Sequence, residues 1–413
     1  MKTNTYSTPL LVLGLLWAVF PASAQLIARY TVQAGPTDRN NCIVHTRLNT
    51  PADASTLVME EVAGKKRVPV NVSVADGEVW WVLSGHTPAG TKRFYELKKG
   101  SLKTTTTALM HITDKNGALI LQEGARQILQ YNYATVEPPA GSDTVYRRSA
   151  FIHPLWAPNG AVLTNAFPNA GHLHHMGIWN PWTHTLFEGR ETDFWNVQKK
   201  EGKVRFVKME TVTSGSVWCG FNASQEHVAF LKNGTEKTAI NEIWKVRAYA
   251  ATHQGQRRCW DLSSVFSCAG DSAVTLLQYR YGGGFGLRTT PAFTAKTSEV
   301  LTSEGKTRKN ADSTRARWVK ITGTTPQGKA GLLIMNAPTN YDSPEPLRVW
   351  PENMEGGELM LNYSPTKMKS WKMTNGNVYT LVYRVMVYDG DITPQEAEEA
   401  WKDFAFPPVV TKE

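Results

Sequence analysis

The sequence predicts an all-β fold, either a sandwich or a barrel of antiparallel strands. Apolar and polar residues alternate in segment after segment beyond residue 202, and this period of two is typical of strands with one buried face. No helical periodicity of useful length occurs before Thr393-Pro394-Gln395-Glu396. There, a capping box with proline at the first helical position predicts one short helix that runs to about Phe404. Many strands and almost no helix indicate sheets that pack on sheets.

The expected strands fall into two groups that a threonine-rich stretch at residues 103–107 separates. We therefore expect a small N-terminal β-sandwich domain over residues 25–105 and a large antiparallel β-sandwich domain with the C-terminal helix over residues 106–413. The first group contains short runs bounded by turn residues, at Asn41–Leu48, Val68–Val74, Glu78–Leu83 and Arg93–Leu97. The second group contains longer alternating runs, at Lys203–Met209, Ala239–Tyr249, Arg258–Ser267, Val274–Tyr281, Arg317–Thr322, Gly331–Asn336 and Tyr379–Tyr388.

Residues 1–24 have the pattern of a secretory signal peptide. Lys2 precedes an apolar run from Pro9 to Phe20, and Ala22-Ser23-Ala24 follows as a cleavage site. The run is too short to span a bilayer as a helix, and no later segment approaches about twenty apolar residues. We expect cleavage after Ala24 and a soluble periplasmic or secreted chain with no transmembrane segment.

Charge and cysteine content narrow the range of partners. The net charge is +9, but the basic residues are scattered in pairs rather than concentrated on one segment, so nucleic acid is not an expected partner. An acidic polysaccharide is compatible with the net positive charge. The four cysteines allow three pairings in an oxidising compartment, and none lies in a C-x-x-C pair.

Residues 153–195 contain the densest set of side chains suited to chemistry. Five of the ten histidines and four of the fourteen tryptophans fall there. Glycine and proline interrupt the segment too often for one helix, so loops and short strands should carry these groups to one place. We expect one cleft to be lined by His153, His172, His174, Trp179, His184 and Glu188.

The chain also resembles a known family. The run YRRSAFIHPLWAPNGAVLTNAFPNAGHLHHMGIWNPWTHTLFEGRETDFWN and the later runs LLQYRYGGGFGLR and TSEGKTRKNADSTRARWV resemble exported bacterial proteins grouped as a domain of unknown function under the label "methane oxygenase PmoA". The resemblance extends over roughly residues 108–390 and implies a galactose-mutarotase-like super-sandwich. It also implies a carbohydrate ligand, because members often accompany polysaccharide-degrading enzymes. This chain departs from the family pattern at Gly171, where an acidic residue is usual, and at Met176, where a third histidine often follows the pair.

Three functions are compatible with these residues. The first is a carbohydrate-active enzyme, a lyase, hydrolase or epimerase, that uses acid–base chemistry. The second is a non-catalytic glycan-binding protein that depends on its tryptophans. The third is a metal-dependent oxidase or oxygenase, as the family label suggests. On a strand, His172 and His174 would share a face and His175 would point away, so a divalent metal would need a third ligand from elsewhere.

The candidate residues follow from the chemistry of each side chain. Histidine, glutamate and tyrosine can transfer protons, which makes the catalytic candidates His153, His172, His174, His175, Glu188 and Tyr281. Aromatic rings stack on sugars and arginine forks bind carboxylates, which makes the substrate-binding candidates Trp179, Trp182, His184, Arg190, Asp193, Trp195, Arg280, Arg308 and Arg348.

Overall fold

The computed structural model describes residues 1, 25–48, 56–100, 109–169 and 171–413. The expected signal peptide and the expected boundary at residues 103–107 both lie outside the described residues. Within the described ranges, no helix is long and apolar enough to cross a membrane. The thiols of Cys42, Cys219, Cys259 and Cys268 are free.

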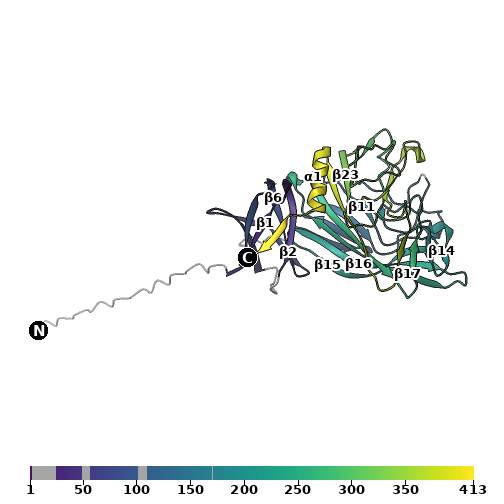
Figure 1. The fold of residues 1–413 in the computed structure, drawn as a ribbon, viewed down its shortest axis with the longest axis horizontal. Helices are drawn as coiled ribbons and strands as arrows, with labels where there is room; N and C mark the ends of the chain where they lie inside the picture. The colour runs from purple at the N-terminus through teal and green to yellow at the C-terminus, as the bar shows by residue number, and fades with distance from the viewer. Residues whose placement is uncertain (2–24, 49–55, 101–108, 170) are drawn as a thin grey trace.

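Two small sheets form a β-sandwich at the N-terminal end of the molecule (Figure 1). Tyr30, Trp81 and Tyr95 pack between them. One sheet has the order β28 (Val409–Lys412), β1 (Gln25–Gln33), β7 (Lys92–Lys99), β3 (Leu57–Ala63) and β4 (Lys66–Val70). The other sheet has the order β2 (Arg39–Arg47), β6 (Glu78–Thr87) and β5 (Val72–Ala75). The last strand of the chain, β28, therefore pairs with the first strand, β1, which the sequence analysis did not expect.

The rest of the chain forms a large antiparallel sandwich of two eight-stranded sheets with a four-stranded sheet beside them. The first sheet has the order β15 (Gly202–Thr213), β16 (Trp218–Phe230), β17 (Glu236–Tyr249), β18 (Arg257–Cys268), β27 (Tyr379–Asp389), β23 (Gly328–Asn336), β22 (Trp318–Thr325) and β21 (Ser298–Thr302). The second has the order β24 (Leu347–Val349), β25 (Met360–Tyr363), β20 (Gly286–Arg288), β12 (Ile178–Trp179), β11 (Phe151–Leu155), β10 (Arg126–Asn132), β9 (Ala118–Glu123) and β8 (Met110–Lys115). The small sheet has the order β14 (Arg190–Thr192), β13 (Thr185–Phe187), β19 (Val274–Leu276) and β26 (Trp371–Met373).

The alternation of the long strands explains how the sandwich forms. Along β18, every second residue is buried, and one main core joins residues of both large sheets, among them Trp260, Leu262, Leu121 and Leu361. The predicted fold class is therefore confirmed: the protein is all-β, with a large antiparallel sandwich and a small sandwich before it, and the described residues contain one α-helix, near the C-terminus.

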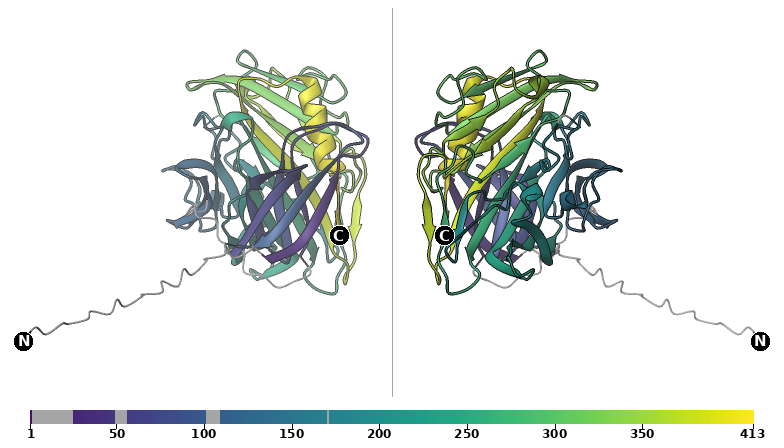
Figure 2. Two further views of the ribbon diagram at one scale, coloured as in Figure 1. Left: turned by 90° about the vertical axis from the view of Figure 1, so that its left-hand side faces the viewer. Right: turned by 90° about the vertical axis from the view of Figure 1, so that its right-hand side faces the viewer.

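The outer face of the first large sheet is covered by two elements, the small sandwich and helix α1 (Pro394–Ala405), which lie next to each other (Figure 2). Thr393 caps α1, since its hydroxyl oxygen accepts a hydrogen bond from the backbone N–H of Glu396. Trp80 of the small sandwich packs against Trp218 of β16. The guanidinium carbon of Arg247 lies over the ring of Trp80, 4.0 Å from its centroid.

Candidate functional site

The three neighbouring histidines lie on a tight turn just before β12. The backbone N–H of His175 donates to the carbonyl oxygen of His172 at 2.8 Å, and the φ angle of His172 is 56°. Gly177 follows, at a point where an added Cβ would lie 2.3 Å from the carbonyl oxygen of Ile152. Only glycine lets the turn approach β11 so closely. The expectation of a strand with His175 pointing away from the other two histidines is therefore wrong.

The turn gathers the three imidazoles into one cluster. Their ring centroids are 5.4 Å apart for His172 and His174, 5.0 Å for His172 and His175, and 4.7 Å for His174 and His175. One nitrogen of each ring lies within 4.8 Å of the other two. His174 and His175 are buried and His172 is half-buried. We call these three residues the histidine triad.

Burial keeps the inner histidines neutral. Burial, together with the neighbouring His172, lowers the pKa of His174 to about 3. Burial and then His174 lower the pKa of His175 well below its usual value. Two of the three imidazoles therefore have a free lone pair at neutral pH.

The histidine triad opens into a pocket with a volume of about 400 Å³, measured out to bulk solvent. The pocket collects segments that are far apart in the sequence. It is lined by His172, His174, His175, Trp195, Asn196, Arg280, Tyr281, Arg348, Trp350, Met354 and Met360.

Tyr281 forms one wall of the pocket. Its ring lies 5.4 Å from that of Trp195, and the Nδ2 atom of Asn196 donates to its hydroxyl oxygen at 3.1 Å. Asp193 fixes this corner, because its Oδ1 accepts from the backbone N–H groups of Trp195 and Asn196 at 2.9 Å. Burial raises the pKa of Tyr281, so its hydroxyl is protonated at neutral pH and can donate a proton.

Two arginines give the pocket a positive charge. Arg280 is exposed, and its guanidinium lies 5.5 Å from the ring centroid of Tyr281. Among the described residues, no carboxylate lies within ion-pair distance of Arg280. Arg348 is half-buried and forms an ion pair with Asp312, since its Nη1 is 3.2 Å from Oδ2 of that residue. At least one cationic group at the pocket is therefore available for an anionic ligand.

Trp350 and Glu355 support the histidine triad, and the sequence analysis missed both. The ring of Trp350 lies 5.0 Å from that of His172 and 5.5 Å from that of His175. Oε1 of Glu355 is 3.2 Å from Nε2 of His172. Trp350 could have been found, because it is two residues from Arg348 at the end of a strand and so falls on the same face. Glu355 carries no such signal, since it lies in a turn 183 residues from His172.

Four of the six residues expected in one cleft do not line the pocket: His153, Trp179, His184 and Glu188. His153 is on β11, and burial lowers its pKa to about 4; its Nδ1 is 2.9 Å from the hydroxyl of Thr164. His184 pairs with Glu191 and stacks on Tyr279 at 3.8 Å. Glu188 is exposed beside β13, where its carboxylate accepts from Lys237 at 2.5 Å and from Ser272 at 3.1 Å. The expected single cleft is thus formed only in part.

Several substrate-binding candidates are engaged elsewhere in the structure. Trp182 is buried in the main core against Phe266 and Trp371, and Trp179 is buried behind the triad, 5.0 Å from the ring of His175. Arg190 donates to the carbonyl oxygen of Phe230. Arg308 is buried and donates to backbone carbonyls of Trp350, Pro351 and Glu358. Of these four side chains, none lines the pocket.

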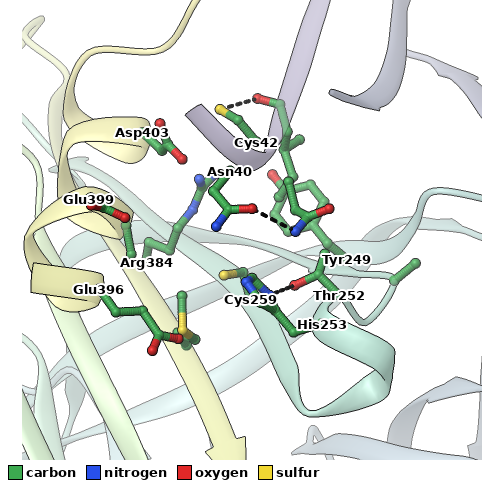
Figure 3. A pocket seen from close by; sticks show the side chains of 15 residues that line it. Asn40, Cys42, Tyr249, Thr252, His253, Cys259, Arg384, Glu396, Glu399 and Asp403 are labelled. Carbon is green, nitrogen blue, oxygen red and sulfur yellow. Dashed lines mark hydrogen bonds between the residues drawn. The ribbon is translucent and has the colours of Figure 1, made fainter. Parts of the chain in front are cut away.

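A second hollow, of about 650 Å³ measured out to bulk solvent, lies between β2, α1 and the outer face of the first large sheet (Figure 3). Two of its charged groups already have ion-pair partners. Asp403 accepts from Arg39 at 2.9 Å, and Arg384 donates to Asp261 at 2.6 and 2.8 Å. Because these charges are neutralised within the protein, we regard this hollow as the junction between the small sandwich and the body. The pocket at the histidine triad is the better candidate site.

The profile of a family of unknown function, DUF6807, matches residues 118–402, which is more than half of the chain. No curated protein matches the chain. Among solved structures, the chain is similar to an alpha-mannosidase from Enterococcus faecalis V583, at 10% identity and a TM-score of 0.43, over 96% of this chain and 46% of that one. This chain therefore spans less than half the length of the mannosidase, and a likeness at this level says nothing about activity. The family description names no activity, so the oxygenase label and the mutarotase-like fold remain implications of the resemblance. The chain belongs to the DUF6807 family.

Proposed function

We propose that this protein is an exported carbohydrate-active enzyme that binds an acidic saccharide, such as a uronate-containing fragment, in the pocket at the histidine triad. The best-supported reaction is elimination, the reaction of a lyase. The observation that carries the proposal is the guanidinium of Arg280, which borders the pocket without a carboxylate partner among the described residues. The signal-peptide pattern of residues 1–24 supports export.

The two arginines favour a ligand with a carboxylate. Arginine binds carboxylates through two parallel hydrogen bonds, and Arg280 and Arg348 both line the pocket. Neutralising the carboxylate of a uronate also makes the adjacent C–H bond more acidic, because the negative charge that develops on proton removal is stabilised. The aromatic side chain of Tyr281 offers a partly exposed surface for the sugar ring.

Proton transfer would use two sides of the pocket. The histidine triad supplies the proton acceptor, with His172 the most accessible imidazole. Tyr281, protonated at neutral pH and held by Asn196, supplies the proton donor. In an elimination, the acceptor takes the proton next to the carboxylate, its electron pair forms a carbon–carbon double bond, and the C–O bond breaks. The leaving oxygen then takes the proton of Tyr281.

Hydrolysis is less well supported. Most glycosidases need a pair of carboxyl groups on either side of the scissile bond. The side chains that line this pocket among the described residues include no aspartate or glutamate, and Glu355 reaches the site only through His172.

The test is an assay of the purified protein against a panel of acidic and neutral oligosaccharides. A lyase produces both new reducing ends and the ultraviolet absorbance of an unsaturated uronate. We expect both signals with an acidic member of the panel, and loss of both in Tyr281→Phe with the melting temperature preserved. Reducing ends without absorbance would assign hydrolysis instead. No turnover and no binding across the acidic members would refute the proposal.

A further inference from the structure

We propose that His172, His174 and His175 together bind one divalent transition-metal ion of the zinc class. The proposed metal site lies in the same pocket as the proposed saccharide site, but metal binding does not require a saccharide. Metal binding is measured on the protein alone, so its failure and the failure of the proposed function can be told apart.

The spacing of the rings suits a shared ion. Three imidazoles that each place a nitrogen 2.0–2.1 Å from one ion have ring centroids separated by about 5 Å. The observed separations are 4.7, 5.0 and 5.4 Å. The ligating nitrogens now lie within 4.8 Å of one another, and a tetrahedral ion would draw them to about 3.3 Å. The three side chains would have to rotate to make that change.

The triad also contains a polar atom without a partner. Nδ1 of His175 is buried and has no hydrogen bond, and the side chain as a whole is 2% exposed. A buried polar atom left unsatisfied costs about 1–3 kcal/mol. A protein that retains such an atom beside two further imidazoles has a ready coordination site, because a metal bond satisfies the lone pair.

Glu355 would orient one of the three ligands of this ion. A metal-ligating histidine usually donates its other ring N–H to a carboxylate, which fixes the tautomer and orients the ring. Nε2 of His172 is 3.2 Å from Oε1 of Glu355, which leaves Nδ1 of His172 for the ion. Glu355 is partly exposed, so a change there tests the ion without disturbing the core.

Imidazole ligands select zinc, copper, iron or nickel over magnesium and calcium. Three protein nitrogens leave a fourth position open, which is the arrangement of catalytic rather than structural zinc sites. That position faces the pocket that Arg280 and Tyr281 line. The ion would therefore hold a water molecule or a ligand oxygen within the pocket. With the ion bound, the three histidines could not accept a proton, and the deprotonated form of that water would take their place as the proton acceptor of the proposed elimination.

The experiment uses the mature chain without a polyhistidine tag, stripped with chelator and titrated with Zn²⁺ by calorimetry, with Co²⁺ absorption as a spectroscopic readout of nitrogen ligation. We expect one equivalent of Zn²⁺ and a melting temperature that rises with Zn²⁺ concentration. His174→Ala should abolish binding, and Glu355→Gln should weaken it by about 10–100-fold. His111→Ala, a half-buried histidine on β8, is the matched control and should bind as the wild type does.

Failure to bind Zn²⁺ or Co²⁺ at millimolar concentration would overturn the proposal. Binding that is unchanged in both His174→Ala and Glu355→Gln would also overturn it, because the ion would then lie elsewhere. If His174→Ala does not fold, the Glu355→Gln result alone decides between these outcomes.

Discussion

Replacement of Arg280 by methionine should weaken the binding of an acidic saccharide and leave the binding of a neutral one unchanged. The side chain of Arg280 is exposed and has no carboxylate partner among the described residues, so the substitution breaks no ion pair within the protein. Methionine keeps a side chain of similar length but loses the contact of the guanidinium with the ring of Tyr281, 5.5 Å from its centroid. The change therefore acts on the ligand rather than on the fold.

The size of the effect follows from the exposure of Arg280. Hydrogen bonds to charged groups contribute about 1.5–3 kcal/mol when protected from water, whereas exposed ion pairs contribute about 0–1 kcal/mol. A guanidinium at the rim of a pocket lies between these limits, at about 1–2 kcal/mol, which corresponds to a 5–30-fold increase in Kd. Added salt should reduce the difference, because it screens exposed charges.

Calorimetry with a uronate oligosaccharide and its neutral counterpart measures this effect. Arg315→Met is the matched control, because Arg315 is also exposed but its guanidinium is already held by Asp342 at 2.8 Å. The control should bind both ligands as the wild type does. An equal loss for acidic and neutral ligands in Arg280→Met, or no loss at all, would refute the electrostatic reasoning.

Three further predictions concern stability. Burial raises the pKa of Glu345 from 4.5 to about 8, so the folded protein keeps a proton that the unfolded chain has lost, and stability should fall as the pH rises from 4.5 to 8. Glu345→Gln should have the same melting temperature as the wild type at pH 5 and a higher one at pH 8; the same difference in melting temperature at both pH values would contradict this. Glu242, fully buried, accepts hydrogen bonds from five side-chain donors, including His227 at 2.8 Å. Glu242→Gln cannot accept all of them and should lose about 3–5 kcal/mol in denaturant unfolding; a loss below 1 kcal/mol would show that the network is dispensable. Gly283→Ala should cost at least about 1–3 kcal/mol, because φ is 94° and the new Cβ would lie 2.3 Å from Trp182; an unchanged melting temperature would show that the backbone can relax there.

The parts of the fold that depend on local pattern could be predicted from the sequence. The alternation from Ala239 to Tyr249 and from Arg258 to Ser267 corresponds to β17 and β18. The capping box at Thr393 corresponds to the first turn of α1. For the two strands, the signal is an alternation that buries one face. For the helix, it is a side chain that caps the backbone N–H groups of the first turn. Each signal lies within about a dozen residues of sequence.

The parts that depend on distant contacts could not be predicted. The pairing of β28 with β1 joins the two ends of the chain, and no local pattern marks it. The expected strand from Val274 to Tyr281 ends at Leu276, because the chain turns into the glycine-rich loop that carries Tyr281 to the pocket.

The candidate site also has a part that the sequence predicted and a part that it did not. The histidines were found because three of them fall within four residues, but their geometry was misjudged, since His172 has a positive φ that the sequence does not signal. Glu188 and His184 were grouped with them by proximity in the sequence. In the structure, each has a neighbouring partner of its own outside the pocket.

The most direct test of the central claim is a crystal structure of Tyr281→Phe with an acidic disaccharide, in which binding is retained and turnover is blocked. The disaccharide should occupy the pocket at the histidine triad, with its carboxylate against Arg280 and Arg348 and the leaving oxygen toward residue 281. A disaccharide bound instead in the hollow between β2 and α1, or an empty pocket at saturating ligand, would contradict the claim.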